Sequence, residues 1–181
     1  MQQGTILGHP KGLFILFFTE LWERFSFYGM RAILVLYLTA QTTDVGNPGL
    51  GWTSKEALAL YGWYGMFVYF MGIFGGAIAD KWLGQKKSVL VGGVFIILGQ
   101  FSLSVDSLMM FWTGLVLIVC GVGLLKPNIS TMVGGLYPKG DSKRDAGFTL
   151  FYIGINIGAL AAPLLVGYFG EKVDELDDIS Y

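Results

Sequence analysis

The stretch Ser107–Lys126, SLMMFWTGLVLIVCGVGLLK, carries no charged residue before its last position. A helix needs about 20 consecutive apolar residues to cross the hydrocarbon core of a bilayer. Three other uncharged windows approach or exceed that length: Ala57–Ala79, Ser88–Val105 and Ala146–Gly170. The sequence therefore predicts at least four membrane-spanning helices.

The composition excludes several classes of protein. Hydrophobic residues make up 54% of the 181 residues and charged residues only 14%, with a mean hydropathy of +0.59, which argues against a soluble domain. The net charge of −1 argues against a nucleic-acid partner, because such binding needs a basic field. The single cysteine, Cys120, and the single histidine, His9, leave no ligand set for zinc or an iron–sulfur cluster. We therefore expect an all-α membrane protein without a metal or another cofactor.

A further apolar segment near the N-terminus is interrupted by four charges that a lipid-exposed helix would not tolerate. The side chains that share one helix face, within about 80° of one another, are Glu20, Arg24, Tyr28 and Arg31. Glu23 lies about 60° to the other side of Glu20. Opposite charges at this spacing can pair, and a carboxylate beside another can titrate at physiological pH. Glu20, Glu23 and Arg24 thus predict a proton-handling site; the alternative is an ion-pair network that only fixes packing.

Three residues are candidates for binding a polar substrate. Arg31 lies two turns beyond Arg24 with no carboxylate beside it, which leaves its guanidinium available for an anion. Lys126 precedes Pro127, which predicts an interrupted helix and a cavity at membrane depth; the alternative is a lysine that reaches the headgroups. Asn156 lies in the middle of its segment, where its amide either binds a peptide-like group or links two helices.

Glycines mark two kinds of feature. The GxxxG spacing, which allows membrane helices to approach closely, occurs in two pairs: Gly72/Gly76 and Gly154/Gly158. Gly76, Asp80 and Gly84 belong to a segment that places an acid and a tight basic turn at a helix end. By itself that segment is compatible with simple charge capping.

Basic residues are distributed unevenly between the predicted loops. Seven lie on one side of the membrane: Lys11, Lys81, Lys86, Lys87, Lys139, Lys143 and Arg144. Only Lys55 and Lys172 lie on the other side. The positive-inside rule therefore predicts a cytoplasmic N-terminus.

Three segments, in this order, resemble signature motifs of one transporter family. Glu20–Phe25, ELWERF, is similar to the motif ExxER(F). The segment from Gly76 to Gly84 resembles the GxxxD(R/K) loop signature of the major facilitator superfamily, with one extra residue before Gly84. Phe151–Gly158, FYIGINIG, is similar to FYxxINxG. Together they resemble the proton-dependent oligopeptide transporter (POT/PTR) family of that superfamily.

This resemblance implies a fold and an activity. The fold is five transmembrane helices, at about 13–40, 57–80, 88–105, 107–136 and 146–170, of an N-terminal six-helix bundle that fills residues 1–181. The sixth helix and the C-terminal bundle of the same protein are absent. The activity is symport of protons with di- and tripeptides into the cell across its inner membrane. The protein would then be a secondary active transporter and not an enzyme.

The resemblance also assigns roles by matched position. Glu20, Glu23 and Arg24 take part in proton coupling, with protons as the coupling ion and no other cofactor. The residues implied for the peptide site are Tyr28, Arg31, Tyr64, Lys126 and Asn156, of which Arg31 and Lys126 face the peptide carboxylate. Many relatives have a tyrosine where this chain has Phe27, so one hydroxyl contact to the peptide is expected to be lost.

Two other readings remain open. A carrier of another anion, such as nitrate or an organic acid, also suits Arg31 and Lys126. A non-transporting membrane subunit, whose charged stripe pairs with a partner helix, suits five helices with an acidic tail. An intramembrane hydrolase is the weakest alternative, because no Ser/His, Cys/His or metal set has a plausible spacing.

Overall fold

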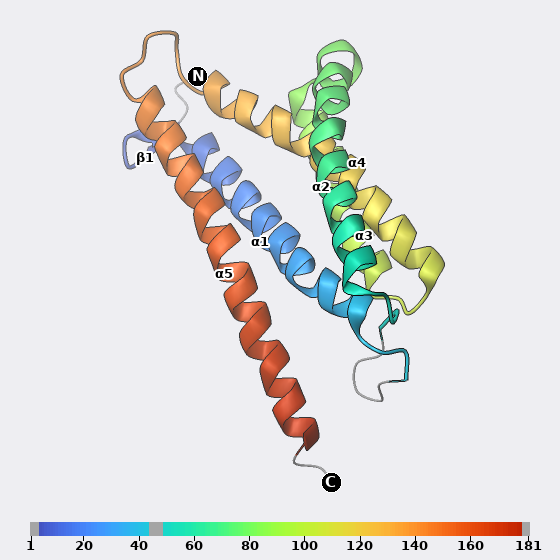
Figure 1. Ribbon diagram of the computed structural model, residues 1–181. Helices are drawn as coiled ribbons and strands as arrows, with labels where there is room; N and C mark the ends of the chain where they lie inside the picture. Colours follow the sequence, from blue (N-terminus) through green and yellow to red (C-terminus); the bar gives the residue numbers. More distant parts are fainter. Residues whose placement is uncertain (1–3, 44–48, 179–181) are drawn as a thin grey trace. The chain divides into compact units, whose positions relative to one another are not determined.

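Five long helices form most of the chain that the structure describes (Figure 1). The structure, a computed structural model, describes residues 4–43 and 49–178, and the side chains only as far as residue 169. The helices are α1 (Lys11–Thr39), α2 (Ser54–Ile78), α3 (Gln85–Leu103), α4 (Leu108–Gly135) and α5 (Arg144–Asp178). A π-helical turn, η1 (Ala79–Leu83), joins α2 to α3. The prediction of an all-α membrane protein with five helices is confirmed, although a small ribbon precedes α1.

Four helices are long and apolar enough to cross a membrane. Their bounds within the described chain are Ser54–Leu83, Gln85–Leu103, Leu108–Gly135 and Arg144–Phe169. α1 has the length of a membrane helix but holds the charges Glu20, Glu23, Arg24 and Arg31. α5 does not end at Gly170, as the uncharged window suggested, but continues to Asp178.

The chain divides into two compact units, which are described separately. Unit 1 comprises Met1–Leu16 and Trp63–Phe148, and unit 2 comprises Phe17–Gly62 and Thr149–Tyr181. In unit 1, α3 and α4 touch backbone to backbone at glycines. A Cβ on Gly92 would lie 2.6 Å from the carbonyl oxygen of Gly121, and one on Gly114 would lie 2.8 Å from that of Gly99.

α2 also meets α4 at a pair of glycines, but not at the pair that the GxxxG spacing suggested. A Cβ on Gly75 would overlap the carbonyl group of Gly123, whereas one on Gly72 would meet no atom within 4 Å. A Cβ on Gly76 would lie 4.0 Å from the Cβ of Pro127. Within the described chain, α2 therefore meets α4 closely at Gly75 and not at Gly72 or Gly76.

Pro127 does not interrupt α4, which corrects the predicted break. Because proline lacks an N–H, the carbonyl of Gly123 loses its donor four residues ahead, and the backbone at Gly75 packs against that carbonyl. The buried Asn128 amide nitrogen donates to the carbonyl of Leu124, at 2.7 Å, and to that of Gly75, at 3.3 Å. The contact with α2 and these bonds stabilise a helix that the local sequence would break.

The N-terminal segment of unit 1 forms a two-stranded antiparallel ribbon of β1 (Thr5–Ile6) and β2 (His9–Pro10). His9 Nδ1 lies 2.8 Å from the hydroxyl of Tyr137, in the loop after α4. Lys143 donates to the carbonyl of Gly8 at 3.3 Å. Burial, and then the Asp141 carboxylate, raise the pKa of Tyr137 above its usual value, so its hydroxyl stays protonated. These bonds tie the start of the chain to the loop between α4 and α5.

Candidate functional site

A buried charge cluster lies on α1 within unit 2. Glu20, Glu23 and Arg24 are only 1%, 6% and 4% exposed. Arg24 Nη2 donates to Glu23 Oε1 at 2.7 Å, and Arg24 Nε donates to Glu23 Oε2. Glu20 Oε1 lies 3.4 Å from Arg24 Nε, one helical turn away. One guanidinium thus meets two carboxylates.

Two glycines of α5 allow that helix to cover the cluster. A Cβ on Gly158 would overlap the carbonyl oxygen of Leu21 and lie 3.1 Å from the Cβ of Arg24. One on Gly154 would lie 2.8 Å from the ring of Phe17. The close packing predicted from the spacing of Gly154 and Gly158 is confirmed. The backbone of α5 thus packs directly beside Arg24. This packing surrounds the cluster with protein, which has a low dielectric constant.

Two carboxylates share one guanidinium in this cluster. Because an uncompensated charge is costly in a buried site, the protonation state decides which contacts of Arg24 are favourable. The structure therefore brings together the three residues for which the sequence predicts a proton-handling role.

Arg31 lies two turns further along α1 in a different environment. Its Cζ lies 4.1 Å from the ring centroid of Tyr61 on α2 and 5.4 Å from that of Phe27. No described carboxylate forms an ion pair with Arg31, and its buried Nε has no hydrogen-bond partner in the described chain. Arg31 therefore contacts two aromatic rings and, among the residues described, no carboxylate.

The other residues expected to contact substrate are divided between the units. In unit 2, Tyr28 is half-buried with its ring edge-on to Phe27, and Asn156 is exposed on α5. In unit 1, Tyr64 is buried, and the half-buried Lys126 places Nζ 4.8 Å from the ring centroid of Tyr69. α4 is continuous through Lys126 and Pro127, so the predicted helix break is wrong.

The loop signature forms the end of α2 and the turn before α3. Gly84 donates to the carbonyl of Ala79 at 2.8 Å and has φ +74°, a left-handed conformation that glycine adopts without strain. Asp80 is exposed, and it forms no ion pair with any side chain that the structure describes. Gly76 is half-buried and faces Pro127. The geometry explains the glycine at position 84 but gives Asp80 no partner.

Sequence reasoning missed the aromatic partners of the cations. No spacing rule connects Tyr61 with Arg31 or Tyr69 with Lys126. Phe27 was noted only for its missing hydroxyl. Its ring lies 5.1 Å from Arg24 Cζ as well as 5.4 Å from Arg31 Cζ, so it contacts both guanidinium groups of α1.

Comparison with known proteins agrees with these motifs. The profile described as "POT family" matches residues 86–175. A di-/tripeptide transporter of Lactococcus lactis subsp. lactis is 51% identical over 171 residues, which are 94% of this chain and 34% of that protein. The uncharacterized transporter YclF of Bacillus subtilis has the same identity and coverage. The chain therefore spans about a third of the length of the curated relatives it matches.

Solved structures give the same result. A crystal structure of a mutant of the peptide transporter POT, in complex with alafosfalin, matches with a TM-score of 0.84 at 51% identity. The match covers 91% of this chain and 34% of that one. Sequence motifs, family profile and fold agree, and the chain belongs to the POT family.

Proposed function

We propose that this chain is the N-terminal helical part of a proton-coupled symporter that takes up di- and tripeptides. The observation that carries the proposal is the buried cluster of Glu20, Glu23 and Arg24, in which two carboxylates meet one guanidinium within α1. The name of the Lactococcus relative, a di-/tripeptide transporter, supports the substrate class. The partner is a C-terminal bundle of the same protein, which faces the substrate path from the other side.

Each residue of the site has a part in this mechanism. Arg31 and Lys126 bind the peptide carboxylate, and Tyr28, Tyr64 and Asn156 line the peptide site. Protonation of a carboxylate in the cluster frees Arg24 from one of its two anionic partners. The protonated and the deprotonated cluster then favour different contacts between helices. Binding of the proton therefore shifts the equilibrium between the inward-open and outward-open conformations.

The location follows from the charges of the loops. Seven basic residues lie at the ends of helices that meet in unit 1, and only Lys55 and Lys172 lie at the opposite ends. The positive-inside rule then puts the N-terminus and the turn with Gly76, Asp80 and Gly84 in the cytoplasm, with the helices in the inner membrane.

A chimera tests the proposed function. The matched 171 residues of the Lactococcus di-/tripeptide transporter are replaced by those of this chain, in a strain without peptide uptake of its own. We expect uptake of labelled dialanine that a protonophore abolishes. A chimera that reaches the membrane and transports no dialanine, while the parent does, contradicts the proposal.

The same cells distinguish a second candidate, a carrier of another anion. Arg31 would suit such a substrate, since a guanidinium binds nitrate and carboxylates alike. If the true substrate is another anion, dialanine does not compete for the site, and excess dialanine should leave the uptake of the labelled anion unchanged. Uptake of dialanine that excess nitrate does not inhibit supports the peptide symporter.

Replacing Arg31 tests its proposed contact with the peptide carboxylate. In the chimera, Arg31→Ala should weaken the binding of dialanine about tenfold to a hundredfold, because a charge-assisted pair is worth about 1.5–3 kcal/mol. Dialanine amide, which lacks that carboxylate, should lose little. Competition curves for both peptides measure the difference, and equal losses would remove Arg31 from carboxylate recognition.

A further inference from the structure

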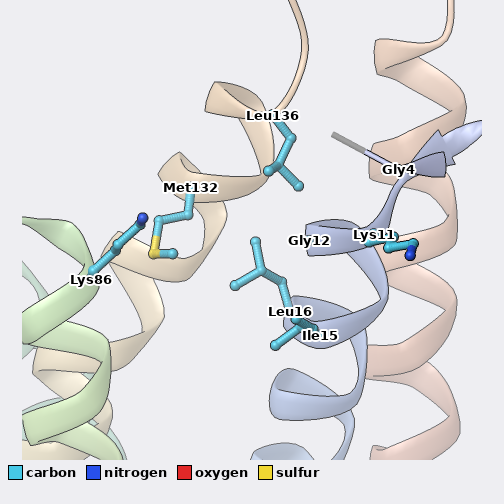
Figure 2. A pocket seen from close by; sticks show the side chains of 8 residues that line it. All are labelled: Gly4, Lys11, Gly12, Ile15, Leu16, Lys86, Met132 and Leu136. Carbon is cyan, nitrogen blue, oxygen red and sulfur yellow. The ribbon is translucent and has the colours of Figure 1, made fainter. Parts of the chain in front are cut away.

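Unit 1 has a cavity of about 450 Å³ between the start of α1, the start of α3 and the end of α4 (Figure 2). Its two lysines, Lys11 and Lys86, lie on opposite sides of the apolar side chains, so they do not form one binding site. A feature that does point to a further role lies in unit 2, at the ring of Phe27.

Phe27 lies against two cations of α1. Its ring centroid is 5.1 Å from Cζ of Arg24 and 5.4 Å from Cζ of Arg31. Both distances are within the range of about 6 Å over which the face of an aromatic ring attracts a guanidinium. Arg24 precedes Phe27 by three residues and Arg31 follows it by four, which is the spacing of side chains that meet on a helix. One ring therefore contacts two guanidinium groups at once.

The two cations differ in their other partners. Arg24 has charged and titratable neighbours on its own helix, namely Glu20, Glu23 and Tyr28. From α5, Gly158 packs beside it. Arg31 forms no ion pair with a carboxylate that the structure describes, and the ring of Tyr61 lies 4.1 Å from its Cζ. Phe27 thus connects the guanidinium of the proposed proton site with the guanidinium proposed for the peptide carboxylate.

The ring itself is held in place. Phe27 is only 5% exposed, and its ring packs edge-on against that of Tyr28, with 5.6 Å between the centroids. A buried ring has few other positions to adopt in a close-packed interior, whereas an arginine side chain on its own samples many rotamers. Phe27 therefore gives both guanidinium groups a common contact, and a shift of one cation against the ring changes the surroundings of the other.

We propose that Phe27 is a positioning residue that couples the cluster of Glu20, Glu23 and Arg24 to Arg31. The inference rests on the proposed function, in which the cluster binds the proton and Arg31 binds the peptide carboxylate. Protonation of a carboxylate weakens one contact of Arg24, and the guanidinium shifts against the ring that also contacts Arg31. The change in this shared contact alters the affinity of Arg31 for the carboxylate. By linkage, the bound peptide alters the affinity of the cluster for the proton by the same factor.

Ring fluorines test the contact, because they weaken the negative face of the ring while its shape changes little. Phenylalanine analogues with one, two or three ring fluorines replace Phe27 in the chimera described above. We expect the affinity for dialanine to fall stepwise, by about fivefold with three fluorines, since a cation–π contact is worth about 1 kcal/mol. Dialanine amide, which lacks the carboxylate, should lose less than about twofold. An affinity for dialanine that rises instead would overturn the inference, because the ring would then compete with the peptide for Arg31.

The coupling is measured as the ratio of dialanine affinities at about pH 5 and about pH 7, between which dialanine keeps both of its charges. Each added fluorine should bring this ratio closer to one. Phe27→Tyr keeps the ring and should keep the ratio, whereas Phe27→Leu removes the ring and should bring the ratio closest to one. The matched control places the same analogues at Phe151, a ring on α5 that is 1% exposed and contacts no cation that the structure describes. These control variants should keep both the affinity and the ratio.

A double-mutant cycle on the purified chain measures the contact without any transport. Phe27→Leu and Arg31→Gln together should lower the melting temperature by less than the sum of the two single losses, because each substitution removes the same contact. Additive losses would overturn the inference. It would also be overturned by a chimera that takes up dialanine with a pH ratio that the fluorines leave unchanged, since Phe27 would then couple nothing. A chimera that takes up no dialanine contradicts the proposed function instead, and the melts still show whether Phe27 and Arg31 interact.

Discussion

Gly75→Ala should destabilise the protein by about 3 kcal/mol or more, because the added methyl group would overlap the backbone of α4. The Cβ would coincide with the carbonyl group of Gly123 and lie 2.9 Å from the backbone nitrogen of Leu124. No side-chain rotation relieves a clash between two backbones, so α2 must move away. That movement also stretches the bond from Asn128 to the carbonyl of Gly75.

A thiol-reactive dye measures this loss, since Cys120 is the only cysteine and is half-buried on α4. The matched control is Gly72→Ala, one turn away on the same helix, where a Cβ meets no atom within 4 Å. Alanine is the better helix former by about 1 kcal/mol, so the control should melt no earlier than the parent. If both variants melt early by the same amount, the cause is not the contact between Gly75 and Gly123.

The long elements could be predicted from the sequence because their signal is local. An uncharged window of about 20 residues is enough to identify a membrane helix, and each of the four windows lies within one helical span or extends beyond it by no more than two residues. The cluster of Glu20, Glu23 and Arg24 was also visible, since one helical turn brings side chains three and four residues apart together. The capping box of Thr53 and Glu56, seen in reciprocal bonds at the start of α2, is equally local.

The contacts between helices could not be predicted in the same way. A GxxxG spacing shows that small residues share a face, but not which face meets a neighbour. In α5 the face of Gly154 and Gly158 meets α1, whereas in α2 the contact uses Gly75. Pro127 gave a false break for a related reason: the contact that supports α4 there comes from another helix.

The aromatic partners of Arg31 and Lys126 have no sequence signal either. Tyr61 lies 30 positions from Arg31, and Tyr69 lies on a different helix from Lys126. The ribbon at Thr5–Pro10 has strands of two residues, too short to show an alternating pattern. Each of these features depends on where whole helices pack, which a single sequence does not contain.

Glu23→Gln should abolish accumulation of peptide against its gradient while leaving exchange of peptide across the membrane. Glu23 holds Arg24 with two hydrogen bonds, and a neutral amide of the same shape removes both the negative charge and the proton-binding oxygen. The amide neither binds nor releases a proton, so an external proton no longer changes the favoured conformation through position 23. Exchange needs only the peptide site, which the substitution leaves in place.

Proteoliposomes that contain the chimera described above measure both activities. A pH gradient drives accumulation of labelled dialanine, and counterflow from preloaded vesicles reports exchange. The matched control is Glu56→Gln, which makes the same chemical change at the exposed capping residue of α2, where glutamine also caps. The control should accumulate peptide like the parent. Accumulation by Glu23→Gln at the parent's level would mean that the cluster only fixes the packing of α1 against α5, and that the proton is carried by another group.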